Sequence, residues 1–532
     1  MPSNDAASIR WGRRAALRRI ALGALAPLLA ACVPSRPAGP TGTGSTASPA
    51  PLQPRAGGRL RVGIVGDIPN LDPHQLGGSV ADVLYPIWDR LMEYGPDTRP
   101  RPSLAERWDQ SSDGTQLELT LRRGVTFHTG RELTSDDVAW TLNRLKTDPL
   151  LAANGFRSQV QPLTAVDVRD KYSLVLKADA PWPGVYNLLC LMSVVDRVRF
   201  QDKGASVPVG TGPFAFGEWM QGDHIWLVRN PHYWSTGHPL VDELHFQLFN
   251  DSQAMVIALE AEAIDLADRP PLLDAVRLQQ DSRLRILISD IGGTRYALLF
   301  NALVPPTDNQ QFRQALLYAL DRRRIVDSVL HGISIPHDLP FATSSPAYDE
   351  ARDNFYSFDL DRARSLVAAS GVAEPTLDFN YVASSREWAG IAQIYQADLA
   401  GIGVTLNLKP VDSVALIAEL RGRTFNGIMT GIVPLGATLP AQQAVDPYFS
   451  PRLSFSGFTS EALLQLADDL QHEVDPAKQA QVYARWSDYA LDQAWTGSIA
   501  TAPPLAALNP RLHGLRYTQL EMLDYREAWL DA

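Results

Sequence analysis

The middle of the chain contains four histidines close together: His224, His232, His238 and His245. Imidazole nitrogens are common ligands of zinc, so this grouping raises the question of a metal site. Their spacings of eight, six and seven residues place neighbours neither on one helix face nor in one tight loop. We therefore interpret them as histidines of strand edges and of the surface, and we predict no metal.

Paired carboxylates are a second candidate for chemistry, because two acids can act as the acid and base of a glycosidase. Asp136 and Asp137 fit the start of a helix, and Asp468 and Asp469 fit a solvated helix face. The sequence contains no H-E-x-x-H, C-x-x-C, G-x-S-x-G or P-loop motif. We therefore predict no catalytic residues.

A third candidate is the segment from Gly210 to Gly212, which begins like a dinucleotide-binding fingerprint. Pro213 follows it directly, Ala215 stands at the third glycine position, and no helical pattern opens there. We interpret these glycines as turn residues, and we predict that the protein has no cofactor.

The first 31 residues have the features of an export signal. Arginines lie within residues 1–19, and residues 20–31 form an apolar run too short to span a bilayer as a helix. The run ends in Leu-Ala-Ala-Cys, which resembles the lipobox of bacterial lipoproteins, so we predict a signal peptide over 1–31 and lipidation of Cys32. An ordinary signal peptide that contains a cysteine is the alternative. Two arginine pairs leave the twin-arginine and general secretion routes both open.

Residues 32–58 are predicted to be a flexible linker, because 16 of the 25 residues from 33 to 57 are Pro, Gly, Ser or Thr. The formal net charge is −11, and it becomes −15 without the leader, which carries five arginines and one acid. So acidic a chain is a poor partner for nucleic acid. The second cysteine, Cys190, lies in an apolar run and is expected to be buried.

The periodicity of apolar residues predicts mixed α and β structure. A first strand is expected from Leu60 to Ile64, and a capped helix is expected from Thr134, three residues ahead of Asp137, up to Pro149. Further helices are expected at 311–330, 359–370, 388–399, 460–471 and 477–493, the 388–399 helix leading into a strand at 404–408, and strands should dominate 115–125 and 163–250. This mixture over about 475 residues favours two α/β lobes.

Several short motifs occur in a fixed order along the chain. They are Leu104–Trp108, Leu121–Gly130, Gly210–Phe214, Arg229–Trp234 and Tyr318–Arg322. In sequence and order they resemble the oligopeptide, dipeptide and nickel family of ABC-transporter solute-binding proteins, known as extracellular solute-binding protein family 5. The resemblance extends over about residues 59–516, and it identifies the chain as a member of that family.

The resemblance implies a two-lobe α/β fold of the periplasmic-binding-protein-like type (type II), with an extra subdomain inserted in lobe one and two segments crossing between the lobes. By resemblance, lobe one takes residues 59–92, 195–292 and 505–532, the inserted subdomain takes 93–194, and lobe two takes 293–504. A ligand held between two lobes stabilises the closed state, because only that state lets it contact both.

In peptide-binding members, a lobe-two aspartate after a Gly-Trp pair holds the amino terminus of the peptide. Here the segment from Thr430 to Ala437 has neither the tryptophan nor an acid, so that clamp is missing. Arg386 lies near, but not at, the position of a carboxylate-binding arginine, and the indole of Trp388 could stack on a ligand. The alternative for Trp388 is a core position in its helix. The expected ligand-binding residues are Arg386, Trp388, Tyr381, Asn426 and Tyr448.

By resemblance, the protein is the substrate-binding lipoprotein of an ABC importer. It would capture a peptide-like solute outside the cytoplasm, hold to the membrane through its lipid anchor, and deliver the solute to the transmembrane subunits of a permease. We expect a monomer. The alternatives are a solute-sensing or chaperone-like lipoprotein of the same fold, a non-peptide ligand such as an opine, an oligosaccharide or a metal chelate, and an exported hydrolase.

Overall fold

The structure is a computed structural model that describes residues 53–75, 80–151, 155–291, 293–434, 440–444, 446 and 448–531. The chain from Pro54 onward forms one compact unit. The predicted signal peptide, Cys32 and most of the predicted linker lie outside the described residues.

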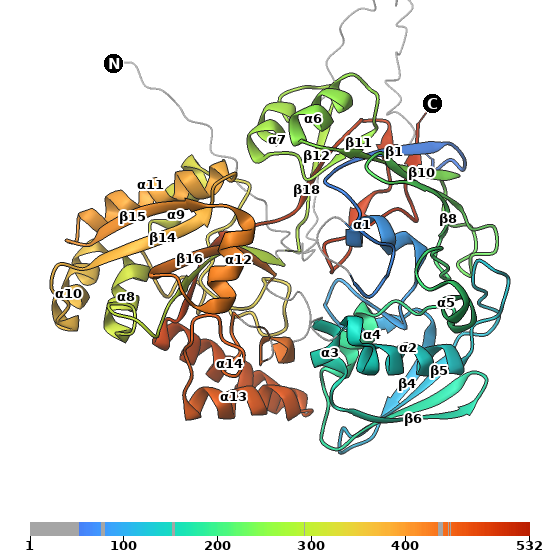
Figure 1. The fold of residues 1–532 in the computed structure, drawn as a ribbon, viewed down its shortest axis with the longest axis horizontal. Helices are drawn as coiled ribbons and strands as arrows, with labels where there is room; N and C mark the ends of the chain where they lie inside the picture. The colour runs from blue at the N-terminus through green and yellow to red at the C-terminus, as the bar shows by residue number, and fades with distance from the viewer. Residues whose placement is uncertain are drawn as a thin grey trace, which may run out of the picture. The chain divides into compact units, whose positions relative to one another are not determined.

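A seven-stranded mixed sheet forms the centre of what we call lobe one (Figure 1). Its strands, in spatial order, are β12 (Arg285–Ile288), β18 (Leu505–Leu508), β11 (Leu266–Asp268), β1 (Arg59–Val65), β10 (Glu243–Phe249), β9 (His224–Arg229) and β8 (Phe214–Met220). Its helices are α1 (Val80–Leu84), α5 (Arg197–Lys203), α6 (Ser252–Glu260) and α7 (Leu272–Leu278), with the 3-10 turn η1 (Tyr85–Ile87). The predicted first strand is confirmed as β1, whose Leu60, Val62 and Ile64 are buried in the lobe-one core.

A separate four-stranded antiparallel sheet lies within residues 93–194. Its strands are β4 (Ala105–Gln110), β5 (Gln116–Leu121), β7 (Ser173–Ala178) and β6 (Leu163–Asp170), and a short ribbon joins β2 (Met92–Tyr94) to β3 (Pro100–Pro102). Its helices are α2 (Ser135–Thr147), η2 (Pro149–Leu151), α3 (Gly155–Val160) and α4 (Val185–Leu191), which lie together in Figure 1. The predicted cap is confirmed, because Thr134 and Asp137 form a capping box at the start of α2.

A five-stranded sheet forms the centre of what we call lobe two. Its strands, in spatial order, are β15 (Thr405–Val411), β14 (Thr376–Val382), β16 (Gly427–Pro434), β13 (Thr294–Phe300) and β17 (Thr496–Thr501). Its helices are α8 (Gln310–Tyr318), α9 (Arg322–Ser328), α10 (Leu360–Ser370), α11 (Arg386–Ala400), α12 (Ser413–Gly422), η3 (Pro440–Ala444), α13 (Glu461–His472) and α14 (Pro476–Gln493). The α11–β15 unit confirms the predicted succession of helix, glycine and strand.

Two segments cross between the lobes, as the resemblance implied. Residues 289–293 connect β12 to β13, and residues 502–504 connect β17 back to β18. They run side by side, because the amide of Ser289 donates to the carbonyl of Pro504 (2.9 Å) and the amide of Ala502 donates to that of Thr294 (2.8 Å). We call these two segments the hinge.

Two predictions of local structure need correction. The single helix predicted over 311–330 is two helices, α8 and α9, because Asp321 caps a new helix by accepting the amide of Arg324 (2.9 Å). The region 163–250 is not all strand, since α4 and α5 lie within it. Both corrections concern helices of seven to nine residues, for which tertiary packing outweighs periodicity.

The β17–β18 return completes both large sheets. β18 pairs with β11 and β12 in lobe one, and β17 pairs with β13 in lobe two. After β18 the chain stays with lobe one, and it forms the short pairs β19 (Leu512–His513) with β22 (Trp529–Leu530) and β20 (Arg516–Tyr517) with β21 (Leu523–Asp524). We call residues 516–524, which contain β20 and β21, the C-terminal hairpin. Its turn borders the hinge.

Candidate ligand site at the hinge

Trp388 and Tyr381, two of the expected ligand-binding residues, lie in the core of lobe two. Trp388 is 2% exposed, and its indole packs edge-on against Tyr296 with ring centroids 5.4 Å apart. Tyr381 is 7% exposed and packs against Phe379. Trp388 therefore occupies the core position that the sequence left open as its alternative role.

Arg386 and Asn426 are exposed at opposite edges of the same sheet. Arg386 begins α11 just beyond the carboxyl end of β14. Asn426 precedes β16, which runs parallel to β14, and its carbonyl accepts the amide of Asp378 (2.9 Å) near the amino end of β14. The structure thus places Arg386 near Tyr381 and Trp388, and it places Asn426 away from them.

Tyr448 lies in a third place, beside a buried arginine. The guanidinium of Arg295 stacks over Phe449, 4.7 Å from the ring centroid, and donates to the hydroxyl of Thr496 (3.3 Å). Burial lowers the pKa of Arg295 to about 9 and raises that of Tyr448 to about 12. The five expected residues therefore do not converge on one site.

A cavity of about 380 Å³ lies between the hinge and the C-terminal hairpin, and we call it the hinge pocket. It is lined by Tyr85, Glu93, Tyr94, Pro96, Cys190, Asp290, Ile291, Ser344, Arg516, Tyr517, Thr518, Gln519, Leu520, Asp524 and Arg526. Most of these residues belong to lobe one, Asp290 and Ile291 belong to the hinge, and Ser344 belongs to lobe two, between α9 and α10. A ligand in this pocket would touch all three parts.

Three buried polar atoms of the hinge pocket have no hydrogen-bond partner among the described residues. They are the hydroxyl of Ser344, the hydroxyl of Tyr517 and the amide oxygen Oε1 of Gln519. A buried polar atom without a partner typically costs about 1–3 kcal/mol, so native proteins keep few of them. Three residues that line the hinge pocket carry such atoms, which makes this wall a candidate for contact with a polar ligand.

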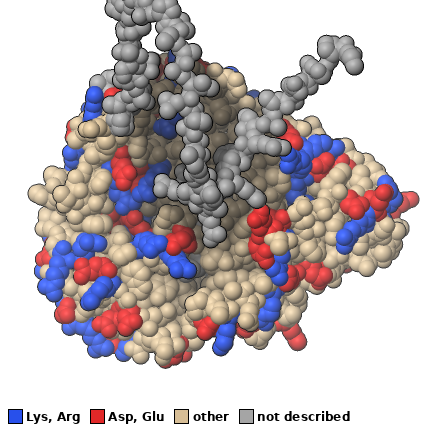
Figure 2. Space-filling view, turned by 180° about the vertical axis from the view of Figure 1, so that it is seen from behind, with Lys and Arg blue, Asp and Glu red and all other residues tan. Residues whose placement is uncertain are grey.

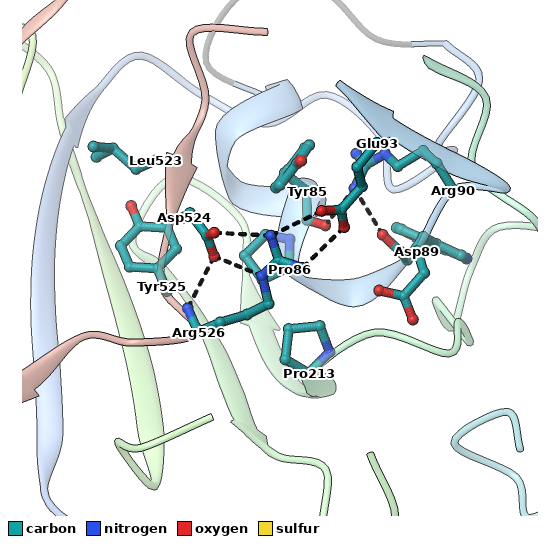
Figure 3. Close-up of a pocket in the computed structure, with 11 residues that line it drawn as sticks. Tyr85, Pro86, Asp89, Arg90, Glu93, Pro213, Leu523, Asp524, Tyr525 and Arg526 are labelled. Carbon is teal, nitrogen blue, oxygen red and sulfur yellow. Dashed lines mark hydrogen bonds and ion pairs between the residues drawn. The ribbon is translucent and has the colours of Figure 1, made fainter. Parts of the chain in front are cut away.

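The charged groups of the hinge pocket are largely paired with one another. Figure 3 shows the guanidinium of Arg526 between the carboxylates of Glu93 and Asp524, beside a smaller cavity of about 20 Å³. Arg526 donates to Glu93 at 2.9 and 3.1 Å and to Asp524 at 2.9 and 2.8 Å, and Arg516 also donates to Asp524 (3.0 Å). Although burial opposes it, the hydrogen bonds from Arg526 lower the pKa of Asp524.

Asp290 differs from these acids. It is exposed, it lines the hinge pocket from the hinge, and no described residue forms an ion pair with it. Arg516 has a single carboxylate partner and is more than half exposed, so its other N–H groups stay available. The pocket therefore offers one free carboxylate and one arginine with spare donors.

A second buried polar cluster, directly beside the hinge pocket, is fully paired, and we call it the motif cluster. The carboxylate of Asp89 accepts from the hydroxyls of Thr211 (3.0 Å) and Tyr233 (3.1 Å) and from the indole of Trp234 (2.8 Å). Burial raises the pKa of Asp89 to about 6. Thr211, Tyr233 and Trp234 all belong to motifs that the sequence analysis singled out.

The glycines of the same motifs serve close packing. A Cβ at Gly210 would lie 2.0 Å from the carbonyl oxygen of Ile87, and one at Gly212 would lie 2.4 Å from that of Pro86. His128 bridges them, because its Nε2 donates to the carbonyl of Gly212 (3.0 Å) and its Nδ1 accepts the amide of Gly210 (3.2 Å). The predicted structural roles of these residues are confirmed.

The sequence analysis did not find the residues of the hinge pocket. Ser344, Tyr517 and Gln519 lie in turns or two-residue strands, where periodicity carries no information. The sequence signal was weak. It consisted of the polar residues Thr518 and Gln519, in a C-terminal segment whose apolar residues otherwise pack in the lobe-one core.

The grouped histidines form no candidate metal site within the described residues. His224 and His245 lie on neighbouring strands with ring centroids 5.2 Å apart. Among the described residues, no three His, Cys, Asp or Glu side chains gather so as to hold a metal ion. Within the described ranges, no helix is both long and apolar enough to cross a membrane. Acidic and basic side chains are interspersed over the face shown in Figure 2.

Known proteins resemble this chain in sequence over most of its length. Residues 99–454 match the family described as bacterial extracellular solute-binding proteins, family 5. Heme-binding protein A of Haemophilus influenzae is 28% identical over 475 residues, covering 80% of this chain and 84% of the relative. The oligopeptide-binding protein AppA of Bacillus subtilis is 25% identical over 436 residues, covering 77% of this chain and 78% of the relative.

Solved structures resemble the fold as well. The ABC transporter substrate-binding protein CtaP of Listeria monocytogenes has a TM-score of 0.81 at 23% identity, covering 90% of this chain and all of CtaP. AppA of Bacillus subtilis in complex with a nonapeptide has a TM-score of 0.74 at 20% identity, covering 90% of this chain and all of AppA. These likenesses confirm the predicted periplasmic-binding-protein fold.

The family match covers more than half of the chain and includes the motifs that form the motif cluster. It also confirms the family to which the sequence motifs pointed. The chain therefore belongs to the family 5 bacterial extracellular solute-binding proteins, which are non-enzymatic substrate-binding proteins of ABC importers that act outside the cytoplasm.

Proposed function

We propose that this protein captures a peptide-like solute in the hinge pocket and delivers it to the transmembrane subunits of an ABC permease. The observation that carries the proposal is the set of three buried, unpartnered polar atoms on Ser344, Tyr517 and Gln519. Hydroxyls both donate and accept, and an amide oxygen accepts, so together they complement the N–H and C=O groups of a peptide bond.

The free charges of the pocket support a ligand with two charged ends. The carboxylate of Asp290 suits an ammonium group, and the spare N–H groups of Arg516 suit a carboxylate. This arrangement replaces the lobe-two acid that the sequence lacks after Thr430. A zwitterionic solute fits such a pocket better than a neutral sugar does, because a sugar leaves the carboxylate of Asp290 without a partner.

We also propose a role for each of the residues expected from the sequence. Arg386, which is exposed at the start of α11, is proposed to contact the solute from lobe two when the lobes close. Trp388 and Tyr381 are proposed to shape lobe two beneath it, since both are buried there. Asn426 and Tyr448 are proposed to make only outer contacts.

Membrane attachment is part of the proposal. Lipidation of Cys32 and the spacer over residues 32–58 would tether the folded part outside the cytoplasm and leave it free to meet the permease. The folded part is proposed to act as a monomer, with lobe one, its inserted subdomain and lobe two divided as the sequence analysis gives them.

The test starts from the protein expressed without its leader, as residues 58–532. Bound solute is extracted under denaturing conditions and identified by mass spectrometry, and calorimetry then measures the binding of di-, tri- and tetrapeptides, sugars and metal chelates. We expect unmodified peptides in the extract and saturable peptide binding. Stoichiometric binding of another class alone would contradict the peptide proposal, and turnover of the solute would contradict a receptor.

A variant pair locates the site in the same experiment. Gln519→Leu removes an amide whose oxygen has no partner and whose nitrogen donates to the carbonyl of Pro96 (3.5 Å), whereas Gln465→Leu removes an exposed amide that donates to Asp469 on α13 (2.9 Å). We expect Gln519→Leu to weaken peptide binding about tenfold and Gln465→Leu to leave it unchanged. Equal binding by both variants would place the solute elsewhere.

A further inference from the structure

The turn of the C-terminal hairpin holds a buried carboxylate, Glu521, which points away from the solvent. Glu521 is 9% exposed and has a φ of +59°, a backbone conformation that is uncommon for glutamate. The turn is closed by the amide of Glu521 donating to the carbonyl of Thr518 and by the amide of Thr518 donating to that of Met522, both at 2.8 Å. The side chain is therefore held in one place by a closed turn.

The carboxylate of Glu521 contacts the hinge. Its Oε1 accepts the backbone amide of Gly293 at 2.8 Å, directly before β13 of lobe two begins. Gly293 lies in the hinge segment that also carries Asp290 and Ile291, two lining residues of the hinge pocket. This hydrogen bond, together with weaker interactions with the hydroxyl and the amide of Thr294, joins the C-terminal hairpin to the segment that must bend when the lobes move.

The hairpin turn is fixed to lobe one on its other side. The guanidinium of Arg269 donates to the backbone carbonyl of Glu521 (3.5 Å) and pairs with the carboxylates of Asp82 and Asp268. Asp82 lies on α1 and Asp268 ends β11, so Arg269 ties the turn to the central sheet of the lobe. The ionisable groups that act on Glu521 are Arg269 and Tyr517, and Asp82 and Asp268 in turn pair with Arg269.

The same turn forms one wall of the hinge pocket. Residues Tyr517 to Leu520 line the cavity from the hairpin, and Asp290 and Ile291 line it from the hinge. A solute that touches both walls spans the two segments that Glu521 already connects. The distance between these walls decides whether one solute can contact both at once.

We propose that Glu521 is a positioning residue that sets the hinge segment at a fixed distance from the pocket hairpin through its bond to the Gly293 amide. This inference rests on the proposed function, because it makes the hinge pocket the place where solute binding and lobe movement meet. Loss of the acceptor leaves the Gly293 amide unpaired and lets the hinge segment move independently of the hairpin.

The test measures the distance between the lobes without any added solute, so it is independent of which solute the protein binds. Spin labels are placed at the exposed positions Glu118 of the inserted sheet and Glu461 of α13, in the full chain with Cys32→Ser. Electron–electron resonance then compares Glu521→Ala, Glu521→Asp, Glu521→Gln and the control Glu527→Ala, which changes an exposed acid of the same C-terminal segment.

We expect the distance distribution of Glu521→Ala to be at least about twice as broad as that of the wild type. Glu521→Asp, whose shorter side chain does not reach Gly293, should broaden it likewise, and it keeps the test usable if the alanine variant does not fold. Glu521→Gln retains an oxygen acceptor and should match the wild type, as should Glu527→Ala. Unchanged alanine and aspartate variants, or a glutamine variant as broad as alanine, would overturn the proposal.

Failure of this test and failure of the proposed function are distinguishable. If the distributions are unchanged but peptides bind in the hinge pocket, the receptor proposal stands and the role of Glu521 is wrong. If the distributions broaden as expected but no peptide binds, Glu521 positions the hinge of a receptor for another solute.

Discussion

The motif cluster lies in lobe one and the hinge pocket lies beside it, and the two differ in how their hydrogen bonds are satisfied. In the motif cluster, the carboxylate of Asp89 accepts three side-chain donors. In the hinge pocket, three polar atoms have no partner among the described residues. A satisfied cluster stabilises one structure, whereas unsatisfied atoms on a cavity wall are available to a ligand.

This difference explains why the motifs of the chain reveal its family but not its solute. Thr211, Tyr233 and Trp234 come from two motifs, and the carboxylate of Asp89 accepts a hydrogen bond from each of them. Such residues hold the fold for any solute. The residues that we propose to select a solute lie in the turn after Arg516 and at the hinge, outside those motifs.

The largest effect should follow from breaking the motif cluster. Asp89→Ala leaves three buried donors without an acceptor, so we expect the free energy of unfolding to fall by about 3 kcal/mol or more. Urea unfolding followed by circular dichroism measures the loss. Asp113→Ala removes an exposed acceptor of a turn and should lower stability by less than about 1 kcal/mol. Equal losses in both variants would contradict the importance of the cluster.

The second-largest effect is a pH dependence of stability, and it comes from Glu521 beside the hinge. Burial raises the pKa of Glu521 to about 7, above its unfolded value of 4.5. The folded state therefore binds this proton more tightly, and the stability it contributes is full below pH 4.5 and is lost as the pH rises through about 7. The effect is of order 2–3 kcal/mol.

Melting temperatures at pH 5 and pH 8 measure this effect. The wild type should lose more stability between these values than Glu521→Gln, which has no proton to release. The buried His128, whose pKa burial lowers to about 4, acts in the opposite direction: its contribution is lost only as the pH falls from about 6.5 towards 4. The same pH dependence in both proteins would mean that Glu521 does not titrate as expected.

The third prediction compares the same change, tyrosine to phenylalanine, in the hinge pocket and in the motif cluster. Tyr517→Phe removes an unpartnered buried hydroxyl, so it should raise the free energy of unfolding by about 1 kcal/mol and weaken peptide binding about tenfold. Tyr233→Phe removes a hydroxyl bonded to Asp89 (3.1 Å), so it should lower the free energy of unfolding by about 1 kcal/mol and leave binding unchanged. Calorimetry measures the binding and urea unfolding measures the stability of the two variants. The reverse result, in which Tyr517→Phe lowers stability and Tyr233→Phe weakens binding, would contradict this division of roles.

The smallest effects should come from single charges around the pocket. We expect Asp290→Asn to weaken binding of peptides with a free amino terminus by about tenfold or less and to leave N-acetylated peptides unaffected. Arg386→Ala, at an exposed position of lobe two, should weaken binding only a few-fold. Calorimetry with paired free and acetylated peptides tests both, and a larger loss in Arg386→Ala would move the site towards lobe two.

Periodicity and caps predicted much of the fold. β1, α2 with its capping box, and the α11–β15 unit follow local patterns in the sequence, and the structure has them. The break between α8 and α9 was not predicted, because Asp321 acts as a cap within an otherwise continuous apolar pattern. Short helices that depend on packing, such as α4 and α5, were also missed.

The residues expected from the sequence and those of the hinge pocket differ for a physical reason. The sequence analysis selected aromatic and arginine residues near lobe-two motifs, and burial places Trp388 and Tyr381 in the core. The hinge pocket is assembled from segments about 200 residues apart, Asp290 and Ile291 at the hinge and Tyr517 to Leu520 in the hairpin. The pairing of β18 with β12 and β11 brings these segments together, and no local pattern encodes it.

Hydrogen exchange tests the central claim most directly. Mass spectrometry compares amide protection with and without the copurified solute, in residues 289–294 and 516–524 at the hinge pocket and in residues 210–214 and 229–234 at the motif cluster. We expect the solute to protect the first pair of segments and to leave the second pair unchanged. Protection of the motif cluster alone, or of residues 381–388 with no change at the hinge, would contradict the account.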